Sequence, residues 1–189
     1  LLTPIYNHRF SRRYGPGSDI IREDWDTLIL LDACRFDDFE SANQLQGELS
    51  SRISRGVDSY EFISRNFVGR RLHDLVYVTA NPHVRLLNGN EFHAVITDPI
   101  DQWDTDVGCV RPESVTAAAK DAHQQYPNKR IIVHYMQPHD PPLGPTGQIL
   151  REKYQIGGPI TNDSSMDNNR VMELVAKGKI PTSGARKAY

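Results

Sequence analysis

The chain has 189 residues, about the length of one domain, and a fold of this size buries a substantial core without staples. Its 22 basic and 24 acidic residues almost cancel. The formal net charge of -2 therefore gives no reason to expect nucleic acid or an anionic membrane as the main partner. No stretch approaches the roughly 18 apolar residues of a membrane span, so we expect a soluble chain.

The two cysteines, Cys34 and Cys109, lack CxxC and Cys/His ligand spacing. This argues against a zinc ribbon and against a disulfide framework. We therefore expect a reducing compartment, with the cytoplasm as the default. The chain opens on Leu1 instead of Met and stops at Tyr189 inside a segment with a helical pattern, so we expect a piece of a longer protein.

The first 24 residues are turn-rich and mostly basic, and a Gly-Pro-Gly triplet interrupts them. We predict an extended lead-in over residues 1–24, outside the core, and one α/β domain over residues 25–189. The domain opens with a short apolar run over residues 27–31, which ends at Asp32. Such a run is typical of a strand that is buried on both faces of a parallel sheet.

The rest of the chain alternates between strand and helix patterns. Helices are predicted over residues 36–45 and 59–67, the second because Asp58 and Glu61 have the spacing of a capping box. The later predictions are strands over residues 76–79, 92–97 and 130–135, a helix over 112–125, a polar surface excursion over 144–167, and helices over 168–177 and from 182 onward.

Strands that alternate with helices predict an α/β fold with an open, mostly parallel sheet and helices on both faces. Sheets of this kind bind ligands outside the carboxyl ends of their strands. Three polar residues fall at or near such ends, namely Asp32, Asn81 and His134. The carboxyl edge of the sheet is therefore where we expect the functional site.

Asp32 follows the first strand directly, and Arg35 comes three residues later. Carboxylate oxygens suit a hard or borderline cation, and a guanidinium suits a tetrahedral oxyanion, so the pair fits phosphate or sulfate chemistry. In the alternative interpretation, Asp32 caps the following helix and Arg35 forms a surface ion pair.

His134 and His139 lie at the end of the strand over residues 130–135 and in the proline-rich loop that follows it. Histidine is the commonest metal ligand and, when protonated, it donates well to an oxyanion. The alternative is a turn in which both imidazoles only hydrogen-bond to the backbone.

Ser59 stands where a helix is predicted to begin. A hydroxyl at this position meets the positive end of the helix dipole and free backbone N–H groups, which favour an anionic ester and an activated nucleophile. The alternative role for Ser59 is that of a helix cap, which Asp58 would fill equally well.

Three sequence blocks together resemble the alkaline phosphatase and sulfatase superfamily, and in particular a group of mostly archaeal sulfatase-like proteins. The blocks are residues 25–37, 78–82 and 133–139. The resemblance implies an alkaline-phosphatase-like fold with a metal at the carboxyl edge of the sheet. It also implies Asp32 as the first metal ligand, Ser59 near the nucleophile position, and His134 and His139 near the substrate anion.

Two features depart from this superfamily. Formylglycine sulfatases carry Cys-x-Pro/Ala-x-Arg, and neither Cys34 nor Cys109 stands in that pattern, so a formylglycine mechanism is not expected. The superfamily also supplies a late Asp-His-Gly segment to the metal, and no Asp-His pair occurs in this chain. We expect the remaining ligands to lie beyond Tyr189.

The leading hypothesis from the sequence is a metal-dependent hydrolase or transferase of sulfate or phosphate esters. Ser59 would be the nucleophile, and Arg35, His134 and His139 would stabilise charge on a small anionic ester. Asp32 would hold a divalent metal, and Zn, Mn, Mg and Ca all remain open.

Two rivals remain. One is a non-catalytic binding or scaffold domain that keeps the fold without a complete metal site. The other is a haloacid-dehalogenase-type phosphatase with Asp32 as nucleophile, but this would require Asp-x-Asp, and Ala33-Cys34 follows instead. Neither the substrate nor the oligomeric state follows from the sequence.

Overall fold

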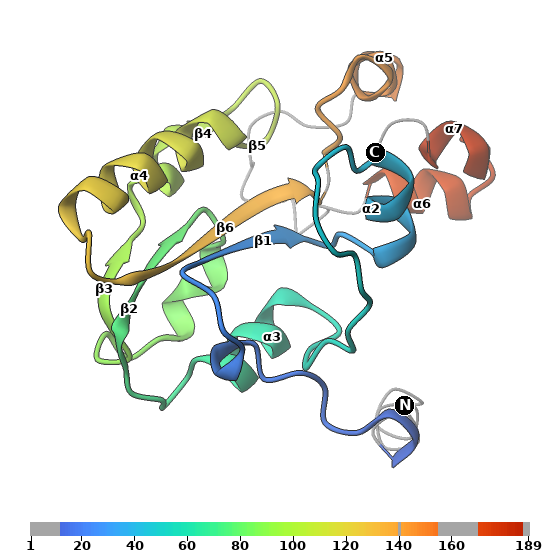
Figure 1. Ribbon diagram of the computed structural model, residues 1–189. Coiled ribbons are helices and arrows are strands. Elements are labelled where there is room, and N and C mark those ends of the chain that lie inside the picture. The colour runs from blue at the N-terminus through green and yellow to red at the C-terminus, as the bar shows by residue number, and fades with distance from the viewer. Residues whose placement is uncertain (1–11, 140, 155–169, 187–189) are drawn as a thin grey trace.

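A four-stranded, all-parallel sheet forms the centre of the molecule (Figure 1). The computed structural model describes residues 12–139, 141–154 and 170–186. Across the sheet the strands run in the order β1 (Thr27–Asp32), β6 (Arg130–Pro138), β2 (Leu72–Thr79) and β3 (Phe92–Ile96). The open α/β architecture expected from the alternating pattern is confirmed.

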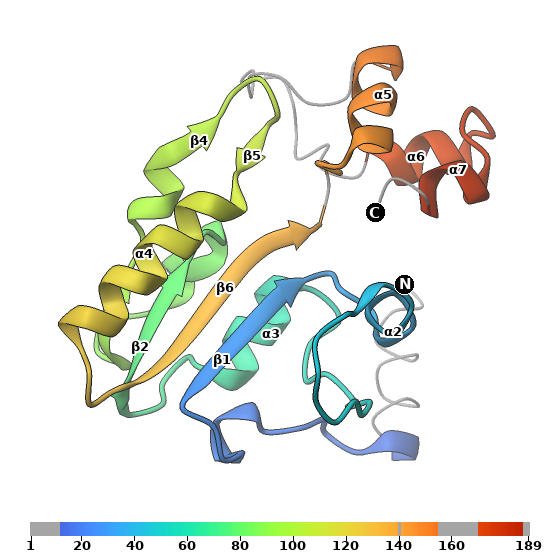
Figure 2. The ribbon, with the colours of Figure 1, turned by 45° about the horizontal axis from the view of Figure 1, so that its top comes forward.

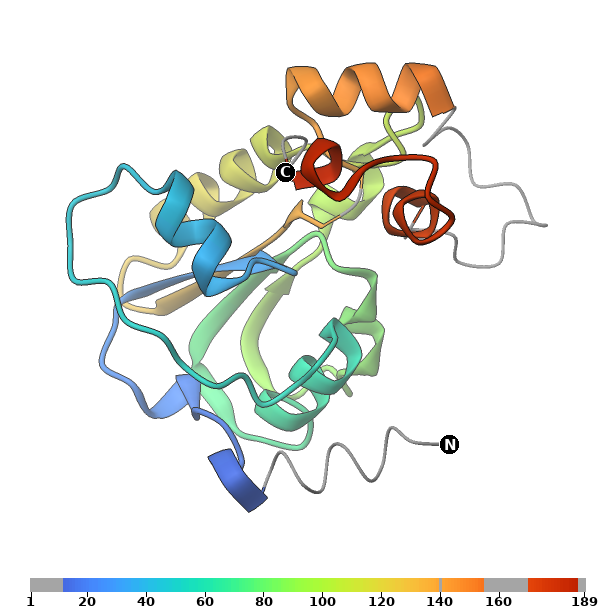
Figure 3. The same cartoon turned by 90° about the vertical axis from the view of Figure 1, so that its right-hand side faces the viewer.

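Helices lie on both faces of this sheet, with α4 on one side and α3 on the other (Figures 1 and 3). The other elements are η1 (Ile20–Arg22), α2 (Phe36–Ala42), α3 (Ser59–Asn66), η2 (Pro82–Leu86), η3 (Asp98–Gln102), β4 (Trp103–Asp104), β5 (Cys109–Val110), α4 (Pro112–Gln125), α5 (Pro145–Tyr154), α6 (Arg170–Ala176) and α7 (Thr182–Arg186). Among the described residues, none of these helices combines the length and apolar character that crossing a membrane requires.

Two apolar clusters fill the space between the sheet and its helices. Alternate strand residues point to opposite faces, so β2, β3 and β6 each contribute to both clusters. On the α4 side, Val115 of the helix packs with strand residues such as Val78 and Val133. On the α3 side Phe67 and Tyr77 pack beside Phe92, with ring centroids 5.2–5.3 Å apart. The α3 side is also the face that carries the polar site described below.

The prediction that the first strand is buried on both faces is wrong, although its position in the sequence is confirmed. β1 is an edge strand with alternating exposure, and Ile29 and Leu31 are 58% and 37% exposed. Helix α4 packs on β6 and β2 and leaves the corresponding face of β1 uncovered (Figure 2). An apolar run shows that a segment is a strand, but the burial of that strand depends on its neighbours.

Most other elements agree with the sequence predictions to within a few residues. Helix α4 has the predicted bounds, whereas α2 ends at Ala42 and β2 begins four residues early, at Leu72. The prediction of a polar surface excursion over residues 144–167 is wrong where the chain forms helix α5. Residues 155–169 lie outside the described residues. Helices α5, α6 and α7 gather beyond the carboxyl end of β6 (Figures 1 and 2).

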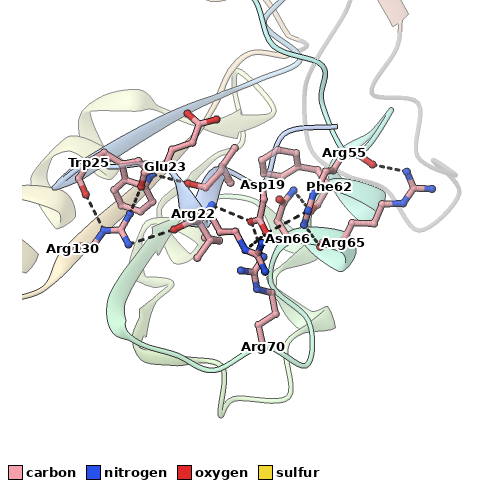
Figure 4. A network of polar contacts seen from close by, with 12 residues as sticks. Asp19, Arg22, Glu23, Trp25, Arg55, Phe62, Arg65, Asn66, Arg70 and Arg130 are labelled. Atoms are coloured by element: carbon pink, nitrogen blue, oxygen red, sulfur yellow. Dashed lines mark hydrogen bonds and ion pairs between the residues drawn. The ribbon is translucent and has the colours of Figure 1, made fainter. Parts of the chain in front are cut away.

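The lead-in before β1 is tied to the sheet by Arg130, the first residue of β6 (Figure 4). Its guanidinium lies 3.8 Å from the centroid of the Trp25 ring and donates hydrogen bonds to the carbonyl oxygens of Trp25 at 2.8 Å and Glu23 at 2.9 Å. Beside this clamp, Ile20 and Ile21 pack against the α3-side cluster. The described part of the lead-in therefore contributes to the core, although we expected it to lie outside.

Replacing Arg130 should show how much this clamp stabilises the fold. We expect Arg130→Ala to lower the free energy of unfolding by about 2 kcal/mol, because it removes three backbone hydrogen bonds, an exposed ion pair with Asp74 and a cation–π contact. Arg130→Lys should recover only part of this, since a single ammonium cannot reproduce the planar fork. Urea denaturation measures the change, with Lys120→Ala on the exposed side of α4 as control. An Arg130→Ala chain as stable as the wild type would contradict the clamp.

Candidate active site

Polar side chains from the three neighbouring strands β1, β6 and β2 meet at one end of the sheet. Asp32 ends β1, His134 lies in β6 opposite Leu30, and Asn81 lies two residues beyond the end of β2. Asp32 shares a strand face with Leu28 and Leu30, which pack into the α3-side cluster, so its carboxylate reaches the same side as α3. The strand alternation thus delivers the carboxylate to the helix that carries Ser59.

A tight turn holds Asp32 at the strand end. The Cys34 N–H donates to the Leu31 carbonyl oxygen at 3.2 Å, and the intervening Ala33 has φ of +60°. The left-handed region is where glycine or asparagine is normally found, and alanine there stores on the order of 1 kcal/mol. Backbone strain of this kind clusters at functional sites. It lies here directly beside the central carboxylate.

Ser59 is the first residue of helix α3, but it does not cap the helix. Asp58 is the cap, because its carboxylate accepts from the Glu61 N–H at 2.7 Å, while the Glu61 carboxylate accepts from the Val57 N–H at 3.0 Å. The predicted capping box is therefore confirmed in this modified form. The Ser59 hydroxyl is left for another partner, and the cap interpretation of Ser59 is wrong.

That partner is Asp32. The Ser59 Oγ lies 2.8 Å from Oδ2 and 3.0 Å from Oδ1 of Asp32, so its proton is directed at the carboxylate. The contact joins residues that are 27 positions apart and partly buried. A hydroxyl that donates to a carboxylate at the N-terminus of a helix is both oriented and polarised for nucleophilic attack.

Asn81 holds the same carboxylate from the other side. Its Nδ2 donates to Asp32 Oδ2 at 2.6 Å, while its Oδ1 accepts from the His83 N–H at 2.9 Å and so caps η2. Asn81 is 1% exposed, which makes this amide part of the fold as well as of the site. Because its amide nitrogen and its amide oxygen are both hydrogen-bonded, the Asn81 side chain has little freedom to turn away from Asp32.

His134 lies behind Asp32, with Nε2 3.9 Å from Asp32 Oδ2. Its Nδ1 is 2.7 Å from the hydroxyl of the buried Tyr77, and the Phe62 ring lies beside it, 6.5 Å between centroids. The 3.9 Å between His134 Nε2 and Asp32 Oδ2 is too long for a hydrogen bond. His134 thus lines the site without contacting the carboxylate directly.

Burial determines the charge state of this pair. Loss of hydration lowers the pKa of His134, and the opposite effect of the nearby Asp32 charge is smaller, so the imidazole is neutral near pH 7. Loss of hydration also raises the pKa of Tyr77 well above its usual value, only partly offset by a hydrogen bond with Thr79. The phenol therefore keeps its proton near pH 7.

Arg35 lies apart from the cluster. It is 72% exposed and forms a two-pronged ion pair with Asp37, with distances of 2.9 and 3.0 Å. Arg35 therefore forms the surface ion pair of the alternative interpretation and does not lie beside Asp32 in this structure. His139 is half-buried just after β6, where its N–H donates to the Met136 carbonyl oxygen at 2.9 Å. The structure thus brings Asp32, Ser59 and His134 together and leaves Arg35 at the surface.

The donor atoms at the site fit part of a divalent-metal centre. A carboxylate offers about four lone-pair directions, and the hydrogen bonds from Ser59 and Asn81 leave one of them open on Asp32 Oδ1. Carboxylate oxygen and imidazole nitrogen are both common ligand types. Within the described ranges, however, no three His, Cys, Asp or Glu side chains are grouped closely enough to hold an ion.

Two members of the site were not among the candidates from the sequence. Asn81 stood out only by its position after a strand, since asparagine before a proline is also an ordinary cap. Tyr77 reads as a core residue, and it is indeed fully buried. The signal available in the sequence was position: Asp32, Asn81 and His134 each fall at or near the carboxyl end of a predicted strand.

Placing a second carboxylate at position 81 tests the tight contact with Asp32. We expect Asn81→Asp to lose about 2 kcal/mol of unfolding free energy at pH 7, because two carboxylates at hydrogen-bonding distance cannot both ionise. The loss should shrink at pH 5, where the pair shares a proton. Asn81→Ala, which only removes a donor, should show no such recovery. Urea denaturation at both pH values measures the unfolding free energy of each variant. If that free energy changes with pH in the same way in both variants, the contact is contradicted.

The lowered pKa of His134 predicts a pH-dependent stability. Because the folded chain holds this proton less tightly than the unfolded chain, stability is full above the usual histidine value near 6.5. It falls by about 1 kcal/mol for each pH unit below that value. We expect His134→Asn, whose amide can still meet Tyr77, to remove this part of the acid sensitivity. The comparison uses urea midpoints in chelator-treated buffer, and equal slopes for both chains would refute it.

Comparison with protein-family models, with curated proteins and with solved structures finds no match for this chain. The resemblance of the three sequence blocks to sulfatase-like proteins therefore stays a prediction. What the chain does has to be inferred from the geometry around Asp32.

Proposed function

We propose that this chain is the part of a metal-dependent sulfate or phosphate ester hydrolase, or transferase, that carries the nucleophile. The supporting observation is the Ser59 hydroxyl at the start of α3, 2.8–3.0 Å from both oxygens of Asp32. The alkaline-phosphatase-like arrangement belongs to the same proposal. It is supported by a parallel sheet whose carboxyl edge carries the site.

Ser59 acts as the nucleophile. Its Oγ attacks the phosphorus or sulfur atom of the ester, its proton passes along the hydrogen bond to Asp32, and the bond to the ester oxygen breaks. The departing alkoxide leaves as the alcohol, with the proton that Asp32 accepted passed on to it. One water molecule then attacks the phosphorus or sulfur atom of the Ser59 ester, its proton returns through Asp32 to the Ser59 Oγ as that bond breaks, and phosphate or sulfate is released. Asn81 keeps the Asp32 carboxylate turned toward Ser59 throughout.

The anionic group of the ester is bound at the N-terminus of α3. The first N–H groups of a helix and its dipole favour negative charge there. The neutral His134 can offer a hydrogen bond from its ring without adding a charge. His139, just after β6, is retained as a second donor, whereas Arg35 would have to leave its ion pair with Asp37 to take part.

A divalent cation belongs to the proposal, with Asp32 Oδ1 as its ligand in the described part of the chain. When bound, such an ion supplies Lewis acidity to the ester oxygens and favours the serine alkoxide. Zn, Mn, Mg and Ca remain equally open, because one carboxylate does not select among them. A cytoplasmic location also stays part of the proposal, with both cysteines present as free thiols.

Metal titration with 4-nitrophenyl phosphate and 4-nitrophenyl sulfate tests this function. We expect turnover that depends on one of the four cations and falls at least a thousandfold in Ser59→Ala, because among the described residues no other hydroxyl hydrogen-bonds to Asp32. Asp32→Ala should fall as far. Ser41→Ala is the matched control, since that serine lies on exposed α2 and binds only a backbone oxygen in the described structure. Full activity in Asp32→Ala would overturn the assignment.

A non-catalytic binding or scaffold domain is the second candidate. It is favoured by the finding that no three potential ligands are grouped within the described ranges. Metal analysis of the purified chain separates the two functions. Stoichiometric metal that is lost in Asp32→Ala supports the hydrolase, whereas absence of both metal and turnover supports the scaffold.

A further inference from the structure

Asp19, in the lead-in, gathers three arginines, the nearby Arg22 and two from distant parts of the chain, Arg55 and Arg70 (Figure 4). Its carboxylate lies 2.8 Å from Arg70, 3.3 Å from Arg55 and 3.5 Å from Arg22. Although burial opposes ionisation of Asp19, the hydrogen bond and positive charge of Arg70 and the charge of Arg55 hold its pKa below the usual value. The lead-in thus presents a fixed negative charge to the body of the domain.

Of these arginines, Arg55 is bound at both ends. Its side chain meets Asp19 and also donates to the Arg65 carbonyl oxygen at 3.4 Å, while its own carbonyl oxygen accepts from Arg65 at 2.5 Å (Figure 4). Its Nε is buried and has no hydrogen-bond partner in the described part of the chain. The Arg55 side chain is only 21% exposed, so its guanidinium depends on Asp19 as counter-ion, since a largely buried charge that loses its partner is destabilising.

The segment from Arg55 to Ser59 connects the Asp19–Arg55 ion pair to the site. A Cβ on Gly56 would lie 2.2 Å from the backbone nitrogen of Phe62, so the segment passes directly over the first turn of α3. Behind it, the Ser18 N–H donates to the Ile53 carbonyl oxygen at 2.8 Å, and a Cβ on Gly17 would lie 2.7 Å from the Ser54 oxygen. The lead-in and this segment are therefore packed backbone to backbone.

We propose that Asp19 is a positioning residue for Ser59, acting through Arg55. By neutralising Arg55 it holds residues 55–58 in place, and these set where α3 begins and how far the Ser59 Oγ lies from Asp32. The inference rests on the proposed role of Ser59 as nucleophile. It adds that a residue of the lead-in, 40 positions before Ser59 in the chain, controls its placement.

Arg70 provides the matched control. It pairs with the same carboxylate, even more closely than Arg55 does, but it belongs to the segment that leads into β2 and lies outside residues 55–58. Loss of either arginine contact removes one ion pair from Asp19. Only the Arg55 contact leads on to Ser59.

The experiment compares Asp19→Asn, Arg55→Lys and Arg70→Lys in the whole chain. We expect Asp19→Asn and Arg55→Lys to speed hydrogen exchange of the Val57 and Glu61 amides about tenfold, because the segment before α3 opens locally. On 4-nitrophenyl esters, both should lower kcat about tenfold or more with KM within about twofold, as expected of a misplaced nucleophile. Asp19→Glu, which keeps the charge, should recover much of kcat.

Arg70→Lys should lose a similar amount of stability in urea while its exchange rates and kcat stay within about twofold of the wild type. If all three variants change exchange and kcat in parallel with stability, Asp19 is only structural and the inference is overturned. Exchange at Val57 and Glu61 is read without substrate. A wild-type chain that hydrolyses no ester therefore rejects the proposed function alone, whereas unchanged exchange in Asp19→Asn rejects this inference alone.

Discussion

The carboxylate of Asp32 is the group around which the carboxyl edge of the sheet is organised. It receives hydrogen bonds from Ser59 at the start of α3 and from Asn81 beyond the end of β2. The buried imidazole of His134 lies behind it. A single negative charge in a partly buried place has to be compensated by donors, because its loss of hydration is otherwise too costly. The positions of Ser59, Asn81 and His134 follow from that requirement, and so does the chemistry open to Ser59.

Two kinds of support keep these donors in place. Near the site, the strained turn at Ala33 and the cap role of Asn81 set the direction of the side chains. Farther away, the lead-in is tied to β6 by Arg130 and to the segment before α3 by Asp19. Both ties are ionic or charge-assisted contacts between parts of the chain that are far apart in sequence, and both are partly shielded from water. They make helix α3, which carries Ser59, part of one frame with the sheet.

The sequence predicted local features well and neighbour-dependent features poorly. Helix α4 and strand β3 have clear periodicity or a clear apolar run, so their bounds are close to those predicted. Helix α5 was missed because Gly147 and few apolar positions give it a weak pattern. At the site, Asp32 and His134 were found from strand ends. The use of Asn81 was not, since nothing in an amide's type shows that its nitrogen reaches across to another strand.

The uncovered face of β1 has a consequence for how the chain behaves in solution. The strand is a run of Leu and Ile without lysine or proline, its outer edge offers unpaired backbone groups, and Ile29 and Leu31 face solvent. Soluble proteins usually protect such an edge with charge, a bulge or a covering element. An uncovered edge of this kind favours concentration-dependent self-association, and a charged residue at position 29 would discourage that without touching the face that holds Asp32.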